Sequence, residues 1–345
     1  MLKYIVKRIL QMIPVFLGVT LLLFILKAPG VLPGDPIKLI TGEKQISEEL
    51  YQQIVERYGL DQPIYVQYYR YVTGLLVFPR IENVESTETD EGGLRVVWEP
   101  DLGTSYQKGR EVRDIFMDKY PNTMKLAVVA IVIEVMMGIG AGIISAVKRY
   151  SFWDVLVTLS TSILVSMPVF WLGMLMQILF GIQFKEWGLP SMPISGMDSA
   201  NYSPFAHLIL PAITLASVST AYVARVMRSQ MLEVDQQDYV RTAHAKGLTS
   251  GAVVRRHMLK NSLIPVITFI GIDFGLMMSG AILTETIFNW PGVGLQIYLA
   301  IGQRDWPVVM GGVIIIVFFV MIINILVDLS YAFLDPRIRY GGAKE

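Results

Sequence analysis

The stretch DYVRTAHAKGLTSGAVVRRHMLKNSLIP, residues 238–265, interrupts an otherwise strongly apolar chain. Apolar runs long enough to cross a bilayer lie on both sides of it. A simple turn between two spans needs only a few residues, whereas about thirty-five lie between Arg228 and Leu263. The stretch therefore predicts a folded polar platform on one membrane face, suited to docking a soluble partner. The alternative is a solvated loop whose Lys and Arg only follow the positive-inside tendency.

Two short helices are expected within this stretch. Asp238 is suited to cap the first helix, and Gly247 can end it in the left-handed conformation that other residues resist. Thr249 or Ser250 can cap the second helix. That helix carries a basic group before Asn261 and Pro265, formed by Arg255, Arg256, His257 and Lys260.

Composition and missing motifs exclude several classes of protein. The 345-residue chain is 53% hydrophobic and only 17% charged, which is too apolar for an ordinary soluble domain. Its formal net charge of zero indicates no nucleic-acid partner, and the lack of cysteine excludes disulfides and thiolate metal sites. No Gly-Lys dipeptide occurs, so a P-loop cannot exist, and neither H-E-x-x-H nor G-x-S-x-G is present. The sequence predicts no catalytic residue, no metal site and no ATPase motif of its own.

Six stretches contain about the 20 apolar residues that a bilayer core requires. They are residues 9–28, 123–147, 155–184, 205–224, 263–288 and 306–329. Glycine pairs at four-residue spacing, Gly138 with Gly142 and Gly271 with Gly275, permit close backbone contact with a neighbouring helix. These patterns predict an all-α polytopic membrane protein with six transmembrane helices.

Basic residues gather beside one set of span ends, which gives an orientation. Short flanks rich in Lys and Arg mark the cytoplasmic side, so both termini are expected there. The flanking residues are Lys3, Lys7, Arg8, Lys148, Arg149, Arg337, Arg339 and Lys344, together with the basic stretch itself. The first apolar run is longer than a secretory signal core and lacks a convincing cleavage site, so it is expected to be a retained transmembrane helix.

The segment between the first two spans is then extracytoplasmic. Its tyrosines, Tyr65, Tyr68 and Tyr69, suit an aromatic interface belt or a ligand cage. Residues 79–99 form an acidic insertion in which Gly92-Gly93 can turn a small hairpin. The expected division is 1–28 for the N-terminus and first helix, 29–121 for an extracytoplasmic subdomain, 122–334 for a five-helix core with a loop at about 229–262, and 335–345 for a cytoplasmic tail.

Two carboxylates lie inside predicted spans, and a charge in lipid is expensive unless it has a function or a partner. Glu134 and Asp273 are therefore candidates for a polar translocation path, or for the interior of the helix bundle. An ion-coupled secondary transporter would use such acids as relays, but no basic or histidine partner accompanies them. Glu285, near the end of the fifth span, is expected to reach the interface.

Several stretches together resemble one family. RTAHAKG at 241–247, followed by R-H-x-L-x-N-x-L-I-P at 256–265, resembles the EAA-type loop of ABC importer permeases. The chain looks more narrowly like the B-type permease subunit of dipeptide and oligopeptide importers. The motifs that carry this narrower resemblance are LPGDP (32–36), GLDQP (59–63), DLGTS (101–105), ETIFNWPG (285–292) and DPR (335–337). Only about residues 79–99 fall outside it, and His244 stands where the family commonly has Arg.

The resemblance implies the type I ABC importer permease fold and assigns the platform to ATPase coupling. The matching positions are Arg241, Thr242, Ala243, Ala245, Lys246, Gly247, Arg255, Arg256, His257 and Asn261. Ser166, Met167 and Pro168 resemble a recurrent third-span motif and become path candidates, since a proline frees a backbone carbonyl that a water-filled route can satisfy. The alternative is packing at a helix kink, which Pro168 is expected to cause.

Partners also follow from the resemblance. It implies half of the membrane channel of an ATP-driven peptide importer, with a second permease of the C type, two ATP-binding subunits that bind ATP and Mg²⁺, and an extracytoplasmic binding protein. The expected location is a prokaryotic cell membrane. Permeases for nickel, glutathione or sugars share the loop, so the substrate stays open. A secondary transporter or a membrane scaffold are the alternatives from other classes.

Overall fold

The computed structural model describes residues 2–27, 61–75, 80–84, 93–97, 100–278 and 281–334, and the single positions 52 and 55. The LPGDP and DPR motifs and the 335–345 tail lie outside these residues. The chain forms two compact units. The larger comprises Met1–Ile5, Lys119–Tyr298 and Ile316–Glu345, and the smaller comprises Val6–Asp118 and Leu299–Ile315. Among the described residues four helices contribute to both units, namely α1 (Leu2–Lys27), α5 (Val112–Glu134), α15 (Val293–Gly302) and α16 (Trp306–Leu334).

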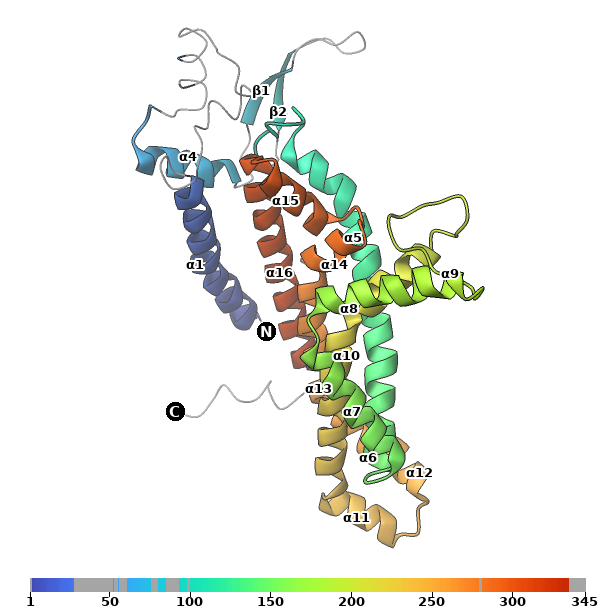
Figure 1. The fold of residues 1–345 in the computed structure, drawn as a ribbon. Helices are drawn as coiled ribbons and strands as arrows, with labels where there is room; N and C mark the ends of the chain where they lie inside the picture. Colours follow the sequence, from blue (N-terminus) through green and yellow to red (C-terminus); the bar gives the residue numbers. More distant parts are fainter. Residues whose placement is uncertain are drawn as a thin grey trace. The chain divides into compact units, whose positions relative to one another are not determined.

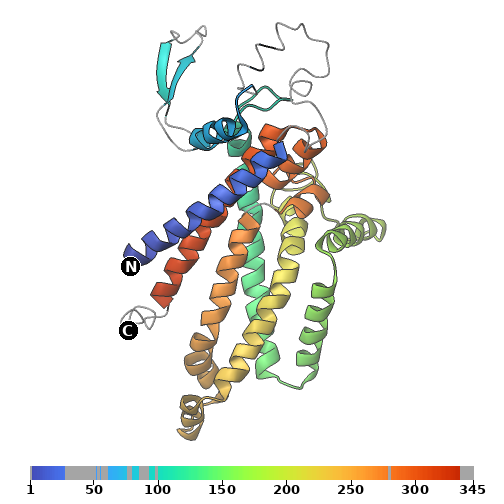
Figure 2. The same cartoon turned by 90° about the vertical axis from the view of Figure 1, so that its left-hand side faces the viewer.

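Helix α10 (Ala206–Asp235) is the central helix of the larger unit. It packs against α6, α7, α8 and α13, and Figure 2 shows the long helices of this unit side by side. The remaining elements of the unit are η1 (Val135–Ile139), α6 (Gly140–Val147), α7 (Phe152–Ser166), α8 (Val169–Met176), η2 (Gln177–Gln183), α9 (Phe184–Glu186), α11 (Asp238–Ala245), α12 (Ser250–Val253), η3 (Val254–Met258), α13 (Leu259–Met278) and α14 (Ile282–Ile287). The elements labelled η are turns of π-helix.

Glycines allow the close packing on α10, as the sequence predicts. A Cβ added to Gly142 would lie 2.6 Å from the Cβ of Met227, and one added to Gly138 would lie 2.7 Å from a methyl of Val223. Such distances leave no room for any side chain, so helices α6 and α10 meet backbone to backbone. Gly275 of α13 approaches Ile323 of α16 in the same way, at 2.8 Å.

Within the described residues, five helices are long and apolar enough to cross a membrane, and six spans are present if one sharply bent pair counts as a single span. That pair is Phe152–Ser166 with Val169–Glu186, and the angle between its parts is 108°. The bend predicted in the span at 155–184 is present, as a break between two helices. Pro168 does not kink a continuous helix but stands at the N-cap of α8, after Met167 in extended backbone. Figure 1 shows α8 and α9 turned away from the direction of α7.

The fifth span also differs from its predicted bounds of 263–288. Residues Ser250–Met278 form one run of helix, so the second platform helix continues into the span through Pro265. The span ends at Met278, and α14 is a separate short helix. Pro265 lies inside α13, and a proline is tolerated within a membrane-spanning helix where neighbouring groups satisfy the freed backbone carbonyl.

The smaller unit contains most of α1, together with α4 (Ile64–Leu75) and a hairpin of β1 (Arg80–Val84) and β2 (Gly93–Val97). Tyr68 of α4 reaches α1, where its hydroxyl donates to the Leu17 carbonyl and its ring lies 5.4 Å from that of Phe24. The predicted hairpin is present, but Gly93 pairs with Val84 inside the strands and does not lie in the turn.

The DLGTS motif belongs to the smaller unit and is held from within it. The hydroxyl of Ser105 and the N–H of Tyr106 donate to the carboxylate of Asp305, which is 2% exposed. Gly103 adopts a φ of +82°, a conformation that favours glycine. The motif therefore serves to fasten this segment to the start of α16.

Candidate functional site

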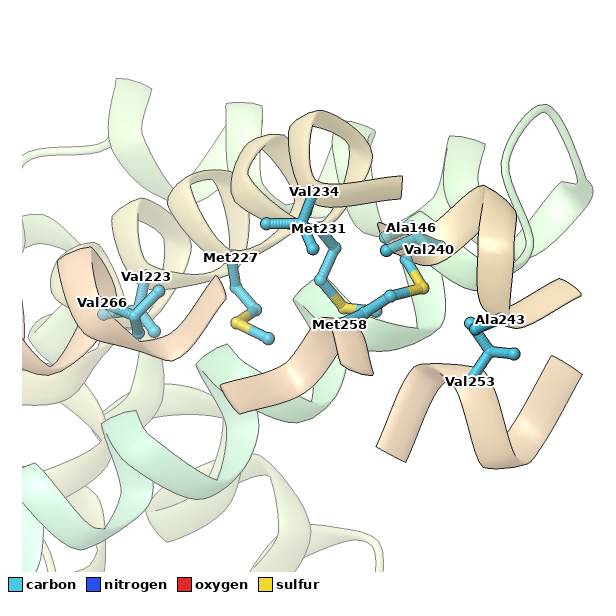
Figure 3. Packing of buried hydrophobic residues seen from close by; sticks show 10 residues of the cluster. All are labelled: Ala146, Val223, Met227, Met231, Val234, Val240, Ala243, Val253, Met258 and Val266. Atoms are coloured by element: carbon cyan, nitrogen blue, oxygen red, sulfur yellow. The ribbon is translucent and has the colours of Figure 1, made fainter. Parts of the chain in front are cut away.

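The platform (residues 238–261) is a folded structure with a packed inner face. Val240 and Ala243 of α11 meet Val253 of α12 and Met258 of η3 in one buried cluster. Figure 3 shows these side chains converging with Met231 and Val234 of α10 and with Ala146. Because α11 follows α10 after a two-residue break, the cluster joins the platform directly to the central helix of the larger unit.

The outer face of the platform carries most of the residues predicted for coupling. Those exposed are Arg241, Thr242, Ala245, Lys246, Gly247, Arg255, Arg256 and Asn261. His257 is half-buried, and Ala243 is only 5% exposed. The side chain of Ala243 packs against Val253, so this residue contributes to the packing between the two platform helices.

Gly247 ends α11 as predicted, with a φ of +79°. The N–H of Gly247 donates to the His244 carbonyl at 2.9 Å, and the N–H of Leu248 donates back to Ala243 at 3.4 Å. This pattern satisfies the free carbonyls of the last turn and reverses the chain. A Cβ at Gly247 would meet nothing within 4 Å, so backbone conformation alone requires glycine here.

One of the two predicted caps is displaced by one residue, and the other is in place. Asp238 is the first residue of α11 and not its cap, which is Gln237 in extended backbone without a side-chain hydrogen bond. Asp238 still places a carboxylate in the first turn, where its negative charge interacts favourably with the positive end of the helix dipole. Thr249 occupies the N-cap position of α12, but its side chain makes no capping hydrogen bond.

One platform contact was not predicted from the sequence. The amide of Asn261 donates to the hydroxyl of Tyr239 at 2.7 Å, which connects α13 to α11 across 22 residues. Tyr239 is 41% exposed, and only its position next to the motif could have indicated this contact in the sequence. The contact gives Asn261 a structural role, because it links α13 to α11.

The intramembrane acids lie together. Glu134 is fully buried, and its carboxyl interacts with that of Asp273. Among the described residues no donor reaches either oxygen of Glu134, nor Oδ2 of Asp273. In this structure Glu134 therefore lies in the interior of the larger unit, not on an exposed surface, and no hydroxyl partner accompanies it.

The third-span candidates lie elsewhere, at the break between α7 and α8. Ser166 and Pro168 are exposed and Met167 is half-buried. The hydroxyl of Ser166 donates to the Ser162 carbonyl at 2.8 Å. These three residues mark the point where the chain changes direction by 108°.

The 285–295 loop contains the ETIFNWPG motif and is held internally. Glu285 has no exposed surface, which corrects the prediction that it reaches the interface. Its carboxylate accepts hydrogen bonds from the Thr123 hydroxyl at 2.8 Å and the Leu295 N–H at 2.9 Å. The indole of Trp290 donates to the Asn122 carbonyl at 3.0 Å. Burial raises the pKa of Glu285, and the hydrogen bonds from Leu295 and Thr123 act in the opposite direction by stabilising the charged form.

Comparison with known sequences identifies the family. Residues 138–340 match the family described as "Binding-protein-dependent transport system inner membrane component", and residues 1–127 match the corresponding N-terminal family. The chain is 36% identical to the dipeptide transport system permease protein DppB of Escherichia coli (strain K12), over 99% of each chain. It is 35% identical to the oligopeptide transport system permease protein AppB of Bacillus subtilis (strain 168), over 99% of this chain and 100% of that one.

Solved structures agree with the fold. The inward-facing MetNI methionine ABC transporter superposes with a TM-score of 0.51 at 15% identity, covering 65% of this chain and 97% of that one. An amino acid ABC transporter superposes with a TM-score of 0.50 at 16% identity, covering 64% and 94%. The chain therefore belongs to the inner-membrane permeases of binding-protein-dependent ABC importers, in the B-type group of these peptide permeases.

Proposed function

We propose that this chain forms half of the channel through which an ABC importer carries dipeptides or oligopeptides. The observation that carries the proposal is the platform, whose exposed basic face resembles the EAA-type loop and whose inner face packs onto α10. Full-length similarity to dipeptide and oligopeptide permeases supports the choice of substrate.

The family implies an importer with a partner permease, ATPases and a binding protein. In our proposal the partner permease is a C-type paralogue, and two ATP-binding subunits carry the ATP and Mg²⁺ that this chain has no motif to hold. One platform offers one ATPase docking face, so two permeases match two ATPases. The extracytoplasmic binding protein delivers the peptide.

In this mechanism nucleotide-driven closure of the ATPases moves the platform as a rigid body. Because the platform shares a buried cluster with α10, the movement reaches the spans directly. The helices then alternate between inward-facing and outward-facing states, whose populations shift with differential binding. Ser166, Met167 and Pro168 are proposed to line the path. Glu134 and Asp273 are proposed to border it in a state other than the one described.

Reconstitution tests the substrate. Liposomes containing the complete complex are expected to accumulate a labelled dipeptide when ATP and binding protein are present, and not when the ATPases are omitted. Uptake by the purified chain alone, driven by an ion gradient, would instead identify a secondary transporter. ATP-driven uptake of nickel, glutathione or a sugar with no uptake of peptide would transfer the chain to another importer of the same family.

The proposed orientation places both termini and the platform in the cytoplasm and residues 29–121 outside. Because the chain has no cysteine, single cysteines introduced at Ser86 and Ser250 are the only sites that a thiol reagent can label, and they test the orientation directly. A membrane-impermeant thiol reagent is expected to label Ser86→Cys in intact cells and Ser250→Cys only after lysis. Labelling of both in intact cells would reject the orientation.

A further inference from the structure

We infer that Arg228 and Asp154 form the joint through which movement of the platform reaches α7 and the break at Met167 and Pro168. Both are positioning residues for transport, and the inference rests on the proposed function. Neither residue belongs to the coupling motif or to the path candidates. The joint lies entirely within the larger unit.

The Asp154 carboxylate is held by donors from three segments. Arg228 of α10 donates from Nε to Oδ1 at 2.8 Å and from Nη2 to Oδ2 at 2.9 Å. The Ser145 hydroxyl of α6 donates to Oδ1, and the N–H of Tyr150 donates to Oδ2 at 2.9 Å. Asp154 is 4% exposed. A two-point guanidinium–carboxylate contact fixes both distance and direction, which a sliding apolar contact does not.

The turn between α6 and α7 depends on the same carboxylate. Tyr150 adopts a φ of +63°, a left-handed conformation that is strained for a residue with a side chain. Its N–H is directed at Asp154. The carboxylate therefore holds the turn as well as the helix that follows, and the start of α7 cannot shift without disturbing Arg228.

Helix α7 packs along α10 and α6, but only two of its residues are buried. Asp154 and Thr161 are its only buried residues, while most of its length is exposed. The Thr161 carbonyl accepts a hydrogen bond from Arg225 of α10 at 3.0 Å. Arg225 and Arg228 are three residues apart and therefore lie on one face of α10. Two arginines of one helix thus hold both buried points of α7.

The other end of the same helix carries the platform. Met231 and Val234 follow Arg228 within two turns of α10 and belong to the buried cluster that includes Val240 and Met258. Helix α10 is continuous from Arg228 to Asp235. A displacement of the platform is therefore transmitted along less than two turns of rigid helix to Arg228, then to Asp154, and along α7 to Ser166.

The test uses the complete complex in liposomes and measures peptide uptake per ATP hydrolysed, with assembly measured by pull-down. Asp154→Asn keeps the size of the side chain but removes the charge that aligns Arg228. We expect normal assembly and a ratio lowered about tenfold, within the range typical of coupling between sites. Arg228→Lys, which keeps the charge but loses the two-point contact, should give an intermediate ratio.

The matched control is Asp118→Asn, which breaks an exposed ion pair with Arg110 at 3.1 Å. Its ratio should equal that of the native chain. A second variant separates position from charge: cysteines at Asp154 and Arg228, joined by a short bifunctional thiol reagent, should recover the ratio that the unjoined pair loses.

Three results would overturn the joint. One is a native ratio in Asp154→Asn with the complex assembled. Another is failure of Asp154→Asn to assemble while Arg228→Lys keeps the native ratio, which would make the contact a fastening only. The last is a cross-linked pair that regains nothing. Absence of peptide uptake by the native complex would instead count against the proposed function and leave the ratio to be measured with the true substrate.

Discussion

The two loops on either side of α13 both carry motifs that resemble the permease family, yet they are built in opposite ways. The platform exposes most of its motif residues and buries the apolar residues between them. The 285–295 loop buries its motif, with Glu285 fully enclosed and bonded to Thr123 and Leu295. A recognisable motif thus marks a constrained position without telling what constrains it. The burial of the motif side chains distinguishes the two cases. Exposed motif residues are suited to contact a partner, whereas buried ones stabilise the chain itself.

This difference predicts two kinds of defect. Substitutions in the 285–295 loop should lower the stability of the permease and leave no intact complex to measure. Substitutions on the exposed face of the platform should leave the permease assembled and lower the coupling between ATP hydrolysis and transport. Loss of permease stability and loss of coupling are measured separately, so the two kinds of defect can be distinguished.

The largest effect is expected from Gly292→Ala. An added Cβ would overlap the carboxyl of Glu285, so this buried group must move away from its donors. Overpacking costs about 1–3 kcal/mol, and a buried polar group that loses its hydrogen-bond donors costs about 1–3 kcal/mol as well. The detergent-purified permease should therefore unfold several degrees lower. Gly140→Ala, where the new Cβ meets nothing within 4 Å, is the control and should change the midpoint little. Equal midpoints for the two variants would contradict the internal role of this loop.

Gly247→Val should have the next largest effect, and it should impair coupling without preventing assembly. A β-branched residue at a φ of +79° is strained by about 1–3 kcal/mol. The strain lies outside the spans, so the complex should assemble and accept loaded binding protein, yet show little uptake and poor substrate-stimulated ATP hydrolysis. Gly247→Asn is the control, because Asn tolerates the left-handed region and the site has open space. Normal coupling in the assembled Gly247→Val complex would show that the platform does not transmit the movement.

The sequence predicts those features that depend on neighbours along the chain. The left-handed conformation of Gly247 could be predicted because this glycine lies between the two short helices that the sequence indicates. Gly138 and Gly142 could be placed at a close contact because their spacing puts them on one helix face. The platform, the apolar spans and the fold class follow from similar local patterns.

Features that depend on distant partners could not be predicted. Glu285 appeared to be an interfacial charge because its partner Thr123 lies 162 residues earlier. The role of Asp154 could not be predicted from the sequence, since this residue lies at the edge of a span and its partner Arg228 is 74 residues away. Pro168 predicts a break, but the angle of 108° between α7 and α8 depends on packing that the proline does not encode.

A moderate effect is expected at the contact between Tyr239 and Asn261. Removing a hydrogen bond of 2.7 Å at a partly exposed site costs about 0.5–1.5 kcal/mol. Tyr239→Phe and Asn261→Ala should each lower substrate-stimulated ATP hydrolysis by a few fold. The double variant should be no worse than the more affected single one, since both remove the same bond. Additive losses would mean that the two residues act separately, for example through contacts of their own with the ATPase.

The smallest effect is expected from reversing the charge at Arg255 or Arg256. Both side chains are exposed on η3, and no ion pair is recorded for either among the described residues. Exposed charges that pair with a partner contribute typically about 0–1 kcal/mol each, and salt screens them. Arg255→Glu should therefore weaken coupling only at low ionic strength, with the native value recovered as salt increases. The measurement is substrate-stimulated ATP hydrolysis across a salt series, with Gly247→Val as the reference that salt does not rescue. A loss that persists at high salt would mean that the arginine is buried in the complex, and that the partner covers more of the platform than its exposed motif.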